Sequence, residues 1–175
     1  HIMKHVDVFL PVSLAMKKIL SDSGERNSDM IPITLGGVRS KPISRDICEA
    51  LKLKLDISRK SKVLLYLGTL NSVRKLSVIM DSFSIIRSKG ADVVLVFVGE
   101  GSSENDRVDL EHKSRTMGIE AHVRFIGRVS RQDTIKYILM SDIGLSYFPK
   151  IPLFEQNSAI KVMEYLALGL PVVCT

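Results

Sequence analysis

Cysteine is scarce in this chain of 175 residues, which contains only Cys48 and Cys174. Two cysteines this far apart lack the spacing of a metal site and are too few for a disulfide framework. We therefore expect two reduced thiols that serve as packing residues, and no metal ion. No apolar run approaches the roughly 18 residues of a membrane-spanning helix, and no cationic and then apolar stretch predicts a secretory signal. These absences favour a cytoplasmic domain.

Acidic residues are the minority among the charged ones, with 19 Asp and Glu against 25 Lys and Arg, a net charge of +6. This balance favours anionic partners, which include nucleic acid, an anionic membrane surface and phosphorylated substrates. The basic residues are scattered along the chain, and there is no zinc-finger, helix-turn-helix or aromatic RNA-reading signature. We therefore expect no nucleic-acid partner.

From residue 62 onward, short continuous apolar runs alternate with helical patterns. The runs 63–67 and 93–98 do not alternate with polar residues, which is typical of strands covered on both faces of a parallel sheet. Further strands are expected at 123–126, 142–147 and from 172, with helices over 73–86, 103–117 and 130–139. This alternation predicts an α/β fold, a Rossmann-like doubly wound parallel sheet with helices on both faces.

The first third of the chain has a weaker pattern. It contains an apolar run at 6–12, a helical pattern at 14–20, a brief strand predicted at 31–35 and a helix predicted at 45–53. This part has no strong core of its own. We interpret residues 1–40 as the end of one domain with its linker, and residues 41–175 as a second domain that is cut short at its C-terminal end.

Glycine follows three of the predicted strands directly. In an open parallel sheet, ligands bind at the carboxyl ends of the strands, so the loops beginning at Gly68, Gly99 and Gly127 should meet at one edge. Glycine allows backbone N–H groups to approach a ligand closely, and a following helix N-terminus favours an anion such as phosphate. Arg74, Lys75 and Lys161 would add positive charge. The loops therefore predict a phosphate-binding edge.

The stretch from Asn157 to Thr175 reads as a loop, a short helix, a Gly-Leu-Pro turn and a strand. Asn157, Lys161 and Glu164 fall on one stripe of this helix, and the remaining positions are mostly apolar. Lys161 before Glu164 is the less favourable order for a helix pair and opposes the helix dipole. We expect a mostly buried helix whose polar stripe meets a polar ligand, although a solvated Lys/Glu pair would produce the same pattern.

Several blocks of the sequence together resemble a known enzyme family. They are the blocks at 67–75, 96–101, 122–129 and 141–146, and above all Ser158-Ala-Ile-Lys-Val-Met-Glu-Tyr-Leu-Ala-Leu-Gly-Leu-Pro-Val-Val173. In order and spacing, residues 62–175 resemble the donor-binding half of retaining glycosyltransferases with the GT-B fold, group 1 (family 4). The segments 6–13 and 31–37 look like the end of the acceptor-side domain.

The resemblance implies roles for individual residues. Glu164 matches the glutamate that binds the donor ribose, and Gln156, Ser158 and Ala159 match the backbone segment at the diphosphate and sugar. Lys161, with Arg74 or Lys75, would stabilise the leaving diphosphate. The loop residues expected around the nucleotide are Gly68, Gly99, Gly101, Phe125, Ile126 and Gly127.

Two positions depart from the family pattern. Gln156 stands where a second glutamate often contacts the sugar, and Thr69 stands where arginine is common. These departures affect the expected sugar contacts more than the nucleotide contacts.

The implied activity is hexosyl transfer with retention from a UDP-, GDP- or ADP-sugar, with no cofactor beyond this donor. The acceptor would be a sugar or a lipid-linked molecule in polysaccharide or glycolipid biosynthesis, held by the missing domain, so that the chain alone is expected to be inactive. Peripheral association of the full-length protein with the inner face of the membrane stays open. Two alternatives also stay open: a non-catalytic nucleotide-binding module, and a sugar-nucleotide epimerase of the same GT-B shape.

Overall fold

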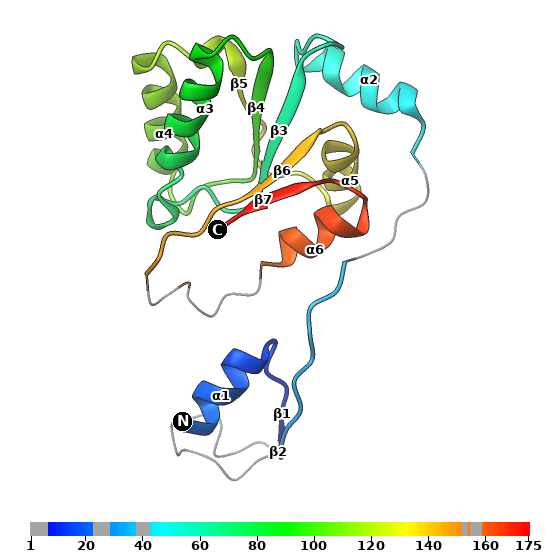
Figure 1. The fold of residues 1–175 in the computed structure, drawn as a ribbon, viewed down its shortest axis with the longest axis vertical. Coiled ribbons are helices and arrows are strands. Elements are labelled where there is room, and N and C mark those ends of the chain that lie inside the picture. The colour runs from blue at the N-terminus through cyan, green and yellow to red at the C-terminus, as the bar shows by residue number, and fades with distance from the viewer. Residues whose placement is uncertain (1–6, 23–28, 38–42, 152–153, 155–158) are drawn as a thin grey trace.

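The structure, a computed structural model, describes residues 7–22, 29–37, 43–151, 154 and 159–175. Its main body is a five-stranded sheet in the order β5-β4-β3-β6-β7 (Figure 1). The strands are β3 (Lys62–Leu67), β4 (Val93–Val98), β5 (Val123–Phe125), β6 (Ile143–Ser146) and β7 (Val172–Cys174). All neighbouring strands are parallel. The predicted doubly wound α/β fold is therefore confirmed.

The order of the strands determines where a ligand would bind. The chain starts at β3 in the middle, moves outward through β4 to β5, and then returns to the other side of β3 with β6 and β7. The two halves of the sheet therefore diverge between β3 and β6, and crossovers on opposite sides leave a crevice at the carboxyl ends of these strands.

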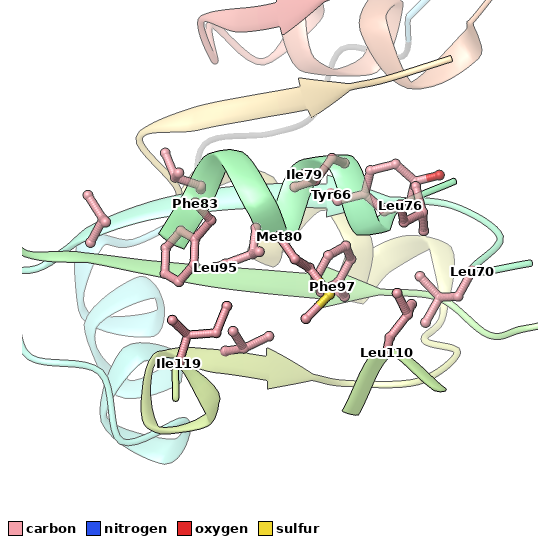
Figure 2. Close-up of a cluster of buried hydrophobic side chains, with 13 residues drawn as sticks. Tyr66, Leu70, Leu76, Ile79, Met80, Phe83, Leu95, Phe97, Leu110 and Ile119 are labelled. Atoms are coloured by element: carbon pink, nitrogen blue, oxygen red, sulfur yellow. The ribbon is translucent and has the colours of Figure 1, made fainter. Parts of the chain in front are cut away.

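Side chains of the central strands alternate between two cores, as expected for a sheet covered on both faces. On one face, residues such as Tyr66 and Phe97 pack against α3 (Ser77–Ser88) and α4 (Glu104–Thr116); Figure 2 shows this cluster. On the other face, Leu65 and Val96 pack with residues of α5 (Arg131–Leu139), of α6 (Ile160–Ala167) and of α2 (Arg45–Lys54).

Local sequence signals determine where the helices begin. Ser103 and Asp106 form a capping box at α4, and the Ser130 side chain accepts a hydrogen bond from the Asp133 backbone N–H at α5. Short 3₁₀ turns, η2 (Ser72–Arg74) and η3 (Glu120–His122), follow β3 and precede β5. The predicted helices at 103–117 and 130–139 agree with α4 and α5 to within a residue or two.

The N-terminal part forms a separate parallel pair, β1 (Val8–Phe9) and β2 (Asp29–Met30), joined through α1 (Leu14–Asp22) (Figure 1). The strand predicted at 31–35 is wrong, because β2 ends at Met30. The backbone N–H groups of Ile31 and Ile33 still donate to Phe9 and Pro11. Pro11 and Pro32 have no N–H, so the ladder cannot continue regularly.

The expectation for the last helix needs a correction. In α6, the buried residues are Lys161 and Tyr165, whereas Ile160, Met163 and Leu166 are exposed by 51%, 37% and 56%. The helix is thus rotated so that Lys161 and Tyr165, four residues apart, both face the sheet. In the described part of the chain, no helix is long and apolar enough to cross a membrane.

Candidate active site at the carboxyl edge of the sheet

A cavity of about 390 Å³ opens at the carboxyl ends of β3 and β4, under the N-terminus of α6. Its walls combine the loop glycines, apolar side chains and four charged residues. The lining residues are Leu67, Gly68, Thr69, Arg74, Val98, Gly99, Arg128, Val129, Thr134, Phe148, Ala159, Ile160, Lys161 and Glu164. The cavity lies where the strand order diverges, which is the expected ligand position for this architecture.

Lys161 is the most unusual residue of the cavity. It is buried, and its Nζ has no hydrogen-bond partner. Burial, together with the nearby Arg74 guanidinium, lowers the pKa of Lys161 to about 7. Nζ lies 4.0 Å from the centre of the Tyr66 ring, and this contact favours the ammonium form. Desolvation of the charge is the larger effect, so the charged form of Lys161 is held at a cost.

Gly68 makes the position of Lys161 possible. At φ +134° Gly68 adopts a backbone conformation that side chains rarely tolerate, and a Cβ there would lie 3.0 Å from Lys161 Nζ. Gly99, at φ +142°, is even more crowded, since a Cβ would lie 2.0 Å from the Gly68 carbonyl oxygen. The two glycines thus bring the loops after β3 and β4 together under the cavity.

Arg74 supplies the second cation. It ends η2, and its Nε and Nη1 are buried without hydrogen-bond partners. Lys75, the alternative in the sequence, adopts a left-handed conformation with φ 48° and is exposed. It lines a different, smaller cavity of about 200 Å³ together with Asp106 and Asp109. Of the two basic residues, Arg74 is therefore the one placed at the cavity.

Asp106 connects the loops that carry these groups. Its carboxylate accepts backbone hydrogen bonds from Ser72, Ser102 and Ser103 at 3.0, 2.8 and 2.9 Å. These bonds, with the one from Ser103 largest, lower the pKa of Asp106. One carboxylate at the start of α4 thus holds η2, and with it Arg74, against the loop after β4.

Glu164 lies one turn along α6 from Lys161 and lines the same cavity. Its side chain is 25% exposed, and Oε1 lies 4.0 Å from Nη2 of Arg131. The carboxylate is partly buried and still accessible, which suits the acceptance of hydrogen bonds from ligand hydroxyls. Lys161 and Glu164 therefore offer an anion site and a hydroxyl site side by side.

The other predicted residues divide into three groups. Gly68, Gly99 and Ala159 line the cavity. Gly101, Phe125, Ile126 and Gly127 do not line it; Phe125 instead stacks on Phe97 with ring centres 5.2 Å apart. Gln156 and Ser158 lie outside the described residues.

Sequence reasoning missed the aromatic residues of the site. Phe148 lines the cavity. The ammonium group of Lys161 lies over the ring of Tyr66, and the guanidinium group of Arg74 lies over the ring of Phe154. Tyr66 sits in a strand whose side chains read as core, and Phe148 and Phe154 flank a loop without a distinctive motif. The only available signal was the position of that loop after β6, at the predicted binding edge.

Among the described residues, no group of three or more His, Cys, Asp or Glu side chains could hold a metal ion. In the same part of the chain, five buried side-chain polar atoms have no hydrogen-bond partner: Asn71 Oδ1, Arg74 Nε, Arg74 Nη1, Ser146 Oγ and Lys161 Nζ. All five belong to residues at the carboxyl side of β3 or β6 or at the start of α6. Buried polar groups normally have partners, so this concentration points to a polar ligand.

Comparison with known proteins defines the class. The model of the family described as glycosyl transferases group 1 matches residues 49–175. The chain therefore belongs to the group 1 glycosyltransferases. Among individual proteins it is similar to EpsD of Bacillus subtilis (strain 168), with 25% identity over 158 residues, 90% of this chain and 39% of EpsD.

Solved structures share the fold. HepE of Anabaena in complex with UDP and glucose superposes with a TM-score of 0.80 at 17% identity, covering 98% of this chain and 45% of HepE. A glycosyltransferase from Rickettsia africae ESF-5 superposes with a TM-score of 0.76 at 18% identity, covering 94% of this chain and 43% of the Rickettsia protein. The matches confirm the GT-B fold expected from the sequence, and the chain spans less than half the length of these relatives.

Proposed function

We propose that this chain is the donor-binding part of a glycosyltransferase that uses a nucleotide-diphosphate sugar. The observation that carries the proposal is a pair of cations, Arg74 and Lys161. Among the described residues, Nε and Nη1 of Arg74 and Nζ of Lys161 are buried atoms without a hydrogen-bond partner. A buried polar group left unpaired costs about 1–3 kcal/mol, and more when it is charged. A dianionic diphosphate would supply both hydrogen-bond acceptors and negative charge for these two cations. The adjacent Glu164 carboxylate would accept hydrogen bonds from the ribose hydroxyl groups.

The choice of donor follows from neighbouring structures. HepE is described in complex with UDP-glucose, and a pneumococcal O-GlcNAc transferase of similar fold is described with UDP and GlcNAc. We propose a UDP-hexose as the first donor to test, with GDP- and ADP-sugars as competitors. Ala159 and Ile160 begin α6 at the cavity, so the helix N-terminus would add backbone N–H groups toward the same phosphates.

The proposed chemistry is glycosyl transfer with retention. As the bond between sugar and diphosphate breaks, positive charge develops on the sugar and negative charge on the leaving diphosphate. Arg74 and Lys161 would stabilise the leaving group through charge that is already in position. Because two cations serve this role, we expect diphosphate binding to persist in the presence of a chelator.

The two-domain organisation is part of the proposal. Residues 1–40 would close an acceptor domain, and residues 41–175 would form the donor domain. The N-terminal elements support this division, because Val8, Leu14 and Ile31 are exposed apolar residues without a core of their own. The acceptor, a sugar or a lipid-linked molecule, would bind to the rest of the acceptor domain, near the membrane in a full-length protein.

Calorimetry with UDP and uridine tests the donor site. We expect UDP to bind at least tenfold more tightly than uridine, since charge-assisted hydrogen bonds contribute about 1.5–3 kcal/mol. Raising the ionic strength from 0.05 to 0.5 M should weaken UDP binding and leave uridine binding nearly unchanged. Equal affinities for the two ligands would show that the cavity is no diphosphate site.

A further inference from the structure

The two cations of the cavity lie against aromatic rings, and within the described ranges neither forms an ion pair with a carboxylate. The Cζ atom of Arg74 lies 5.3 Å from the ring centre of Phe148 and 5.3 Å from that of Phe154. Lys161 Nζ lies 5.4 Å from the Phe148 ring and 4.0 Å from the Tyr66 ring. Phe148 is therefore shared by both cations. The Phe148 and Phe154 rings are tilted by 57° with centres 5.5 Å apart.

This arrangement differs chemically from an ion pair. A carboxylate would use the N–H groups of Arg74 and Lys161 and would cancel their charge, so an incoming anion would have to displace it. An aromatic face attracts a cation through its quadrupole and carries no net charge. The rings can therefore hold both side chains while Nε, Nη1 and Nζ remain free of hydrogen-bond partners.

The backbone of Phe148 is fixed by Thr175, the residue that follows β7. Its N–H donates to Oγ1 of Thr175 at 3.0 Å, and the Thr175 hydroxyl donates to the Phe148 carbonyl at 3.1 Å. The N–H of Thr175 in turn donates to the carbonyl of Ser146 at 3.2 Å. One threonine thus holds the loop after β6 against the end of β7, and with it the Phe148 ring at the cavity.

We propose that Phe148 is a positioning residue that preorganises Arg74 and Lys161 for a diphosphate. Tyr66 and Phe154 complete this aromatic clamp, and Thr175 fixes its backbone. The inference rests on the proposed donor function, since it assigns the clamp to the same anion site. Preorganisation matters because two cations close together repel each other, and without the rings their long side chains would spread into solvent before the anion arrives.

Calorimetry on Phe148 variants tests the clamp, with UDP and uridine as probes. Phe148→Leu keeps an apolar side chain of comparable size and removes the aromatic face, whereas Phe148→Tyr keeps the face. We expect Leu to lower UDP affinity by about 5- to 30-fold, in line with a lost cation–π contact, and Tyr to stay within threefold of the parent. Uridine affinity should change by less than twofold in both variants.

Variants at two further positions separate positioning from general packing. Tyr147→Leu removes the neighbouring aromatic residue, which lines a groove beside α3 outside the cavity, and should leave the ratio of UDP to uridine affinity unchanged. Thr175→Val should lower that ratio several-fold, and Thr175→Ser should restore it. Thermal unfolding of each variant confirms that it is folded.

The outcomes distinguish the clamp from the proposed function. A parent chain that binds UDP tightly and a folded Phe148→Leu variant that binds it equally well would overturn the clamp and leave the donor site intact. Equal loss of UDP and uridine affinity in Phe148→Leu would also overturn it, since general damage to the cavity would explain the result. A parent that binds neither UDP nor inorganic pyrophosphate would overturn both proposals.

Discussion

At the scale of single residues, Lys161 carries opposite consequences for stability and binding. Its ammonium group is buried, with Arg74 nearby and with no acceptor in the part of the chain that the structure describes, so in the unliganded fold the charge is a destabilising feature. The same unsatisfied charge is what an anionic ligand would neutralise. Residues of this kind are typical of functional sites, where local stability is lost in favour of binding.

Replacement of Lys161 by methionine should separate these two effects. Lys161→Met fills a similar volume without charge and should stabilise the unliganded chain by about 1–4 kcal/mol at pH 7. The same change should weaken UDP binding by at least tenfold. Urea denaturation and calorimetry measure the two quantities. Lys89→Met, at the exposed lysine that follows α3, is the matched control and should change neither. A loss of stability in Lys161→Met would contradict the assignment.

The lowered pKa of Lys161 also predicts a pH dependence. The folded pKa of about 7 lies below the ordinary lysine value of 10.5, so the unfolded chain binds more protons between these pH values. Stability of the unliganded parent should therefore rise as the pH increases from 7 toward 10, and Lys161→Met should lack this part of the rise. Denaturation of both proteins at pH 7, 8.5 and 10 measures the difference. Identical slopes would show that Lys161 does not titrate in this range.

Ligand binding should have the opposite pH dependence. A bound diphosphate favours the ammonium form, so UDP affinity should fall as the pH rises above 7, because a proton must be taken up on binding. Between pH 7 and 9 the diphosphate itself is fully ionised, since phosphate monoesters have a second pKa near 6. Calorimetry in buffers of different ionisation enthalpy measures the proton uptake directly, and Lys161→Arg should abolish it.

Glu164 offers a test of the ribose end of the cavity. Glu164→Ala should weaken UDP and uridine by the same factor, about 10- to 100-fold, because hydrogen bonds to a charged group contribute about 1.5–3 kcal/mol each. Glu164→Gln should retain part of the affinity, since the amide keeps one acceptor oxygen. If Glu164→Ala weakens UDP binding and leaves uridine binding unchanged, Glu164 acts at the phosphates and the ribose assignment is wrong.

At the scale of elements, α6 is held on the sheet by Tyr165. Its hydroxyl accepts from the Leu67 N–H at 2.9 Å and donates to the Leu65 carbonyl at 3.3 Å. The ring lies directly over Gly144 in β6, where a Cβ would come within 2.5 Å of ring carbon Cδ2. The position of Lys161 and Glu164 therefore depends on a tyrosine and a glycine that do not line the cavity.

Gly144→Ala should displace the Tyr165 ring and move α6. We expect a loss of about 1–3 kcal/mol in unfolding free energy from overpacking, together with weaker UDP binding. Tyr165→Phe should cost about 1–2 kcal/mol because the Leu67 N–H loses its acceptor. Gly36→Ala, at an exposed glycine that has no neighbours within 4 Å and, like Gly144, no positive φ, controls for the added methyl group alone. Unchanged UDP affinity in Gly144→Ala would show that α6 tolerates the displacement.

The sequence predicted elements better than contacts. Continuous apolar runs identified β3 and β4 because both faces of these strands are buried, and the helical patterns at 103–117 and 130–139 identified α4 and α5. The rotation of α6 was missed, because Lys161 is the polar residue that faces inward while Ile160 and Leu166 face outward. Hydrophobic periodicity assumes that apolar residues are buried, and this assumption fails where a site requires a buried charge.

The candidate site follows the same pattern. Gly68, Arg74, Lys161 and Glu164 were found from motif and position, and they meet at one cavity. Phe148 and Thr175 could not be found, since their contact joins β6 to β7 across 27 residues of chain and no local signal marks it. The sequence could not distinguish Arg74 from Lys75 as the cation of the site. In the structure Lys75 adopts a left-handed conformation, and only Arg74 lines the cavity.

At the scale of the whole molecule, the chain spans only part of its relatives, and transfer should need the rest. The aromatic clamp and the loops can bind a donor, but an acceptor must be held in the correct orientation for transfer, and such positioning provides a large part of the rate. We therefore expect UDP-sugar binding without transferase activity from this chain alone. Incubation with the best-binding UDP-sugar and a membrane extract as acceptor source tests this, and transfer at the rate of a full-length protein would contradict it.

The unsatisfied cations have one further consequence, for the lifetime of the protein in a cell. A ligand that binds only the folded state adds stability that grows with the logarithm of its concentration, about 2.7 kcal/mol at one hundred times its Kd. Since Arg74 and Lys161 destabilise the empty fold, donor-free molecules should open more often and be proteolysed faster. Abundance of the protein would then follow the supply of its own sugar donor.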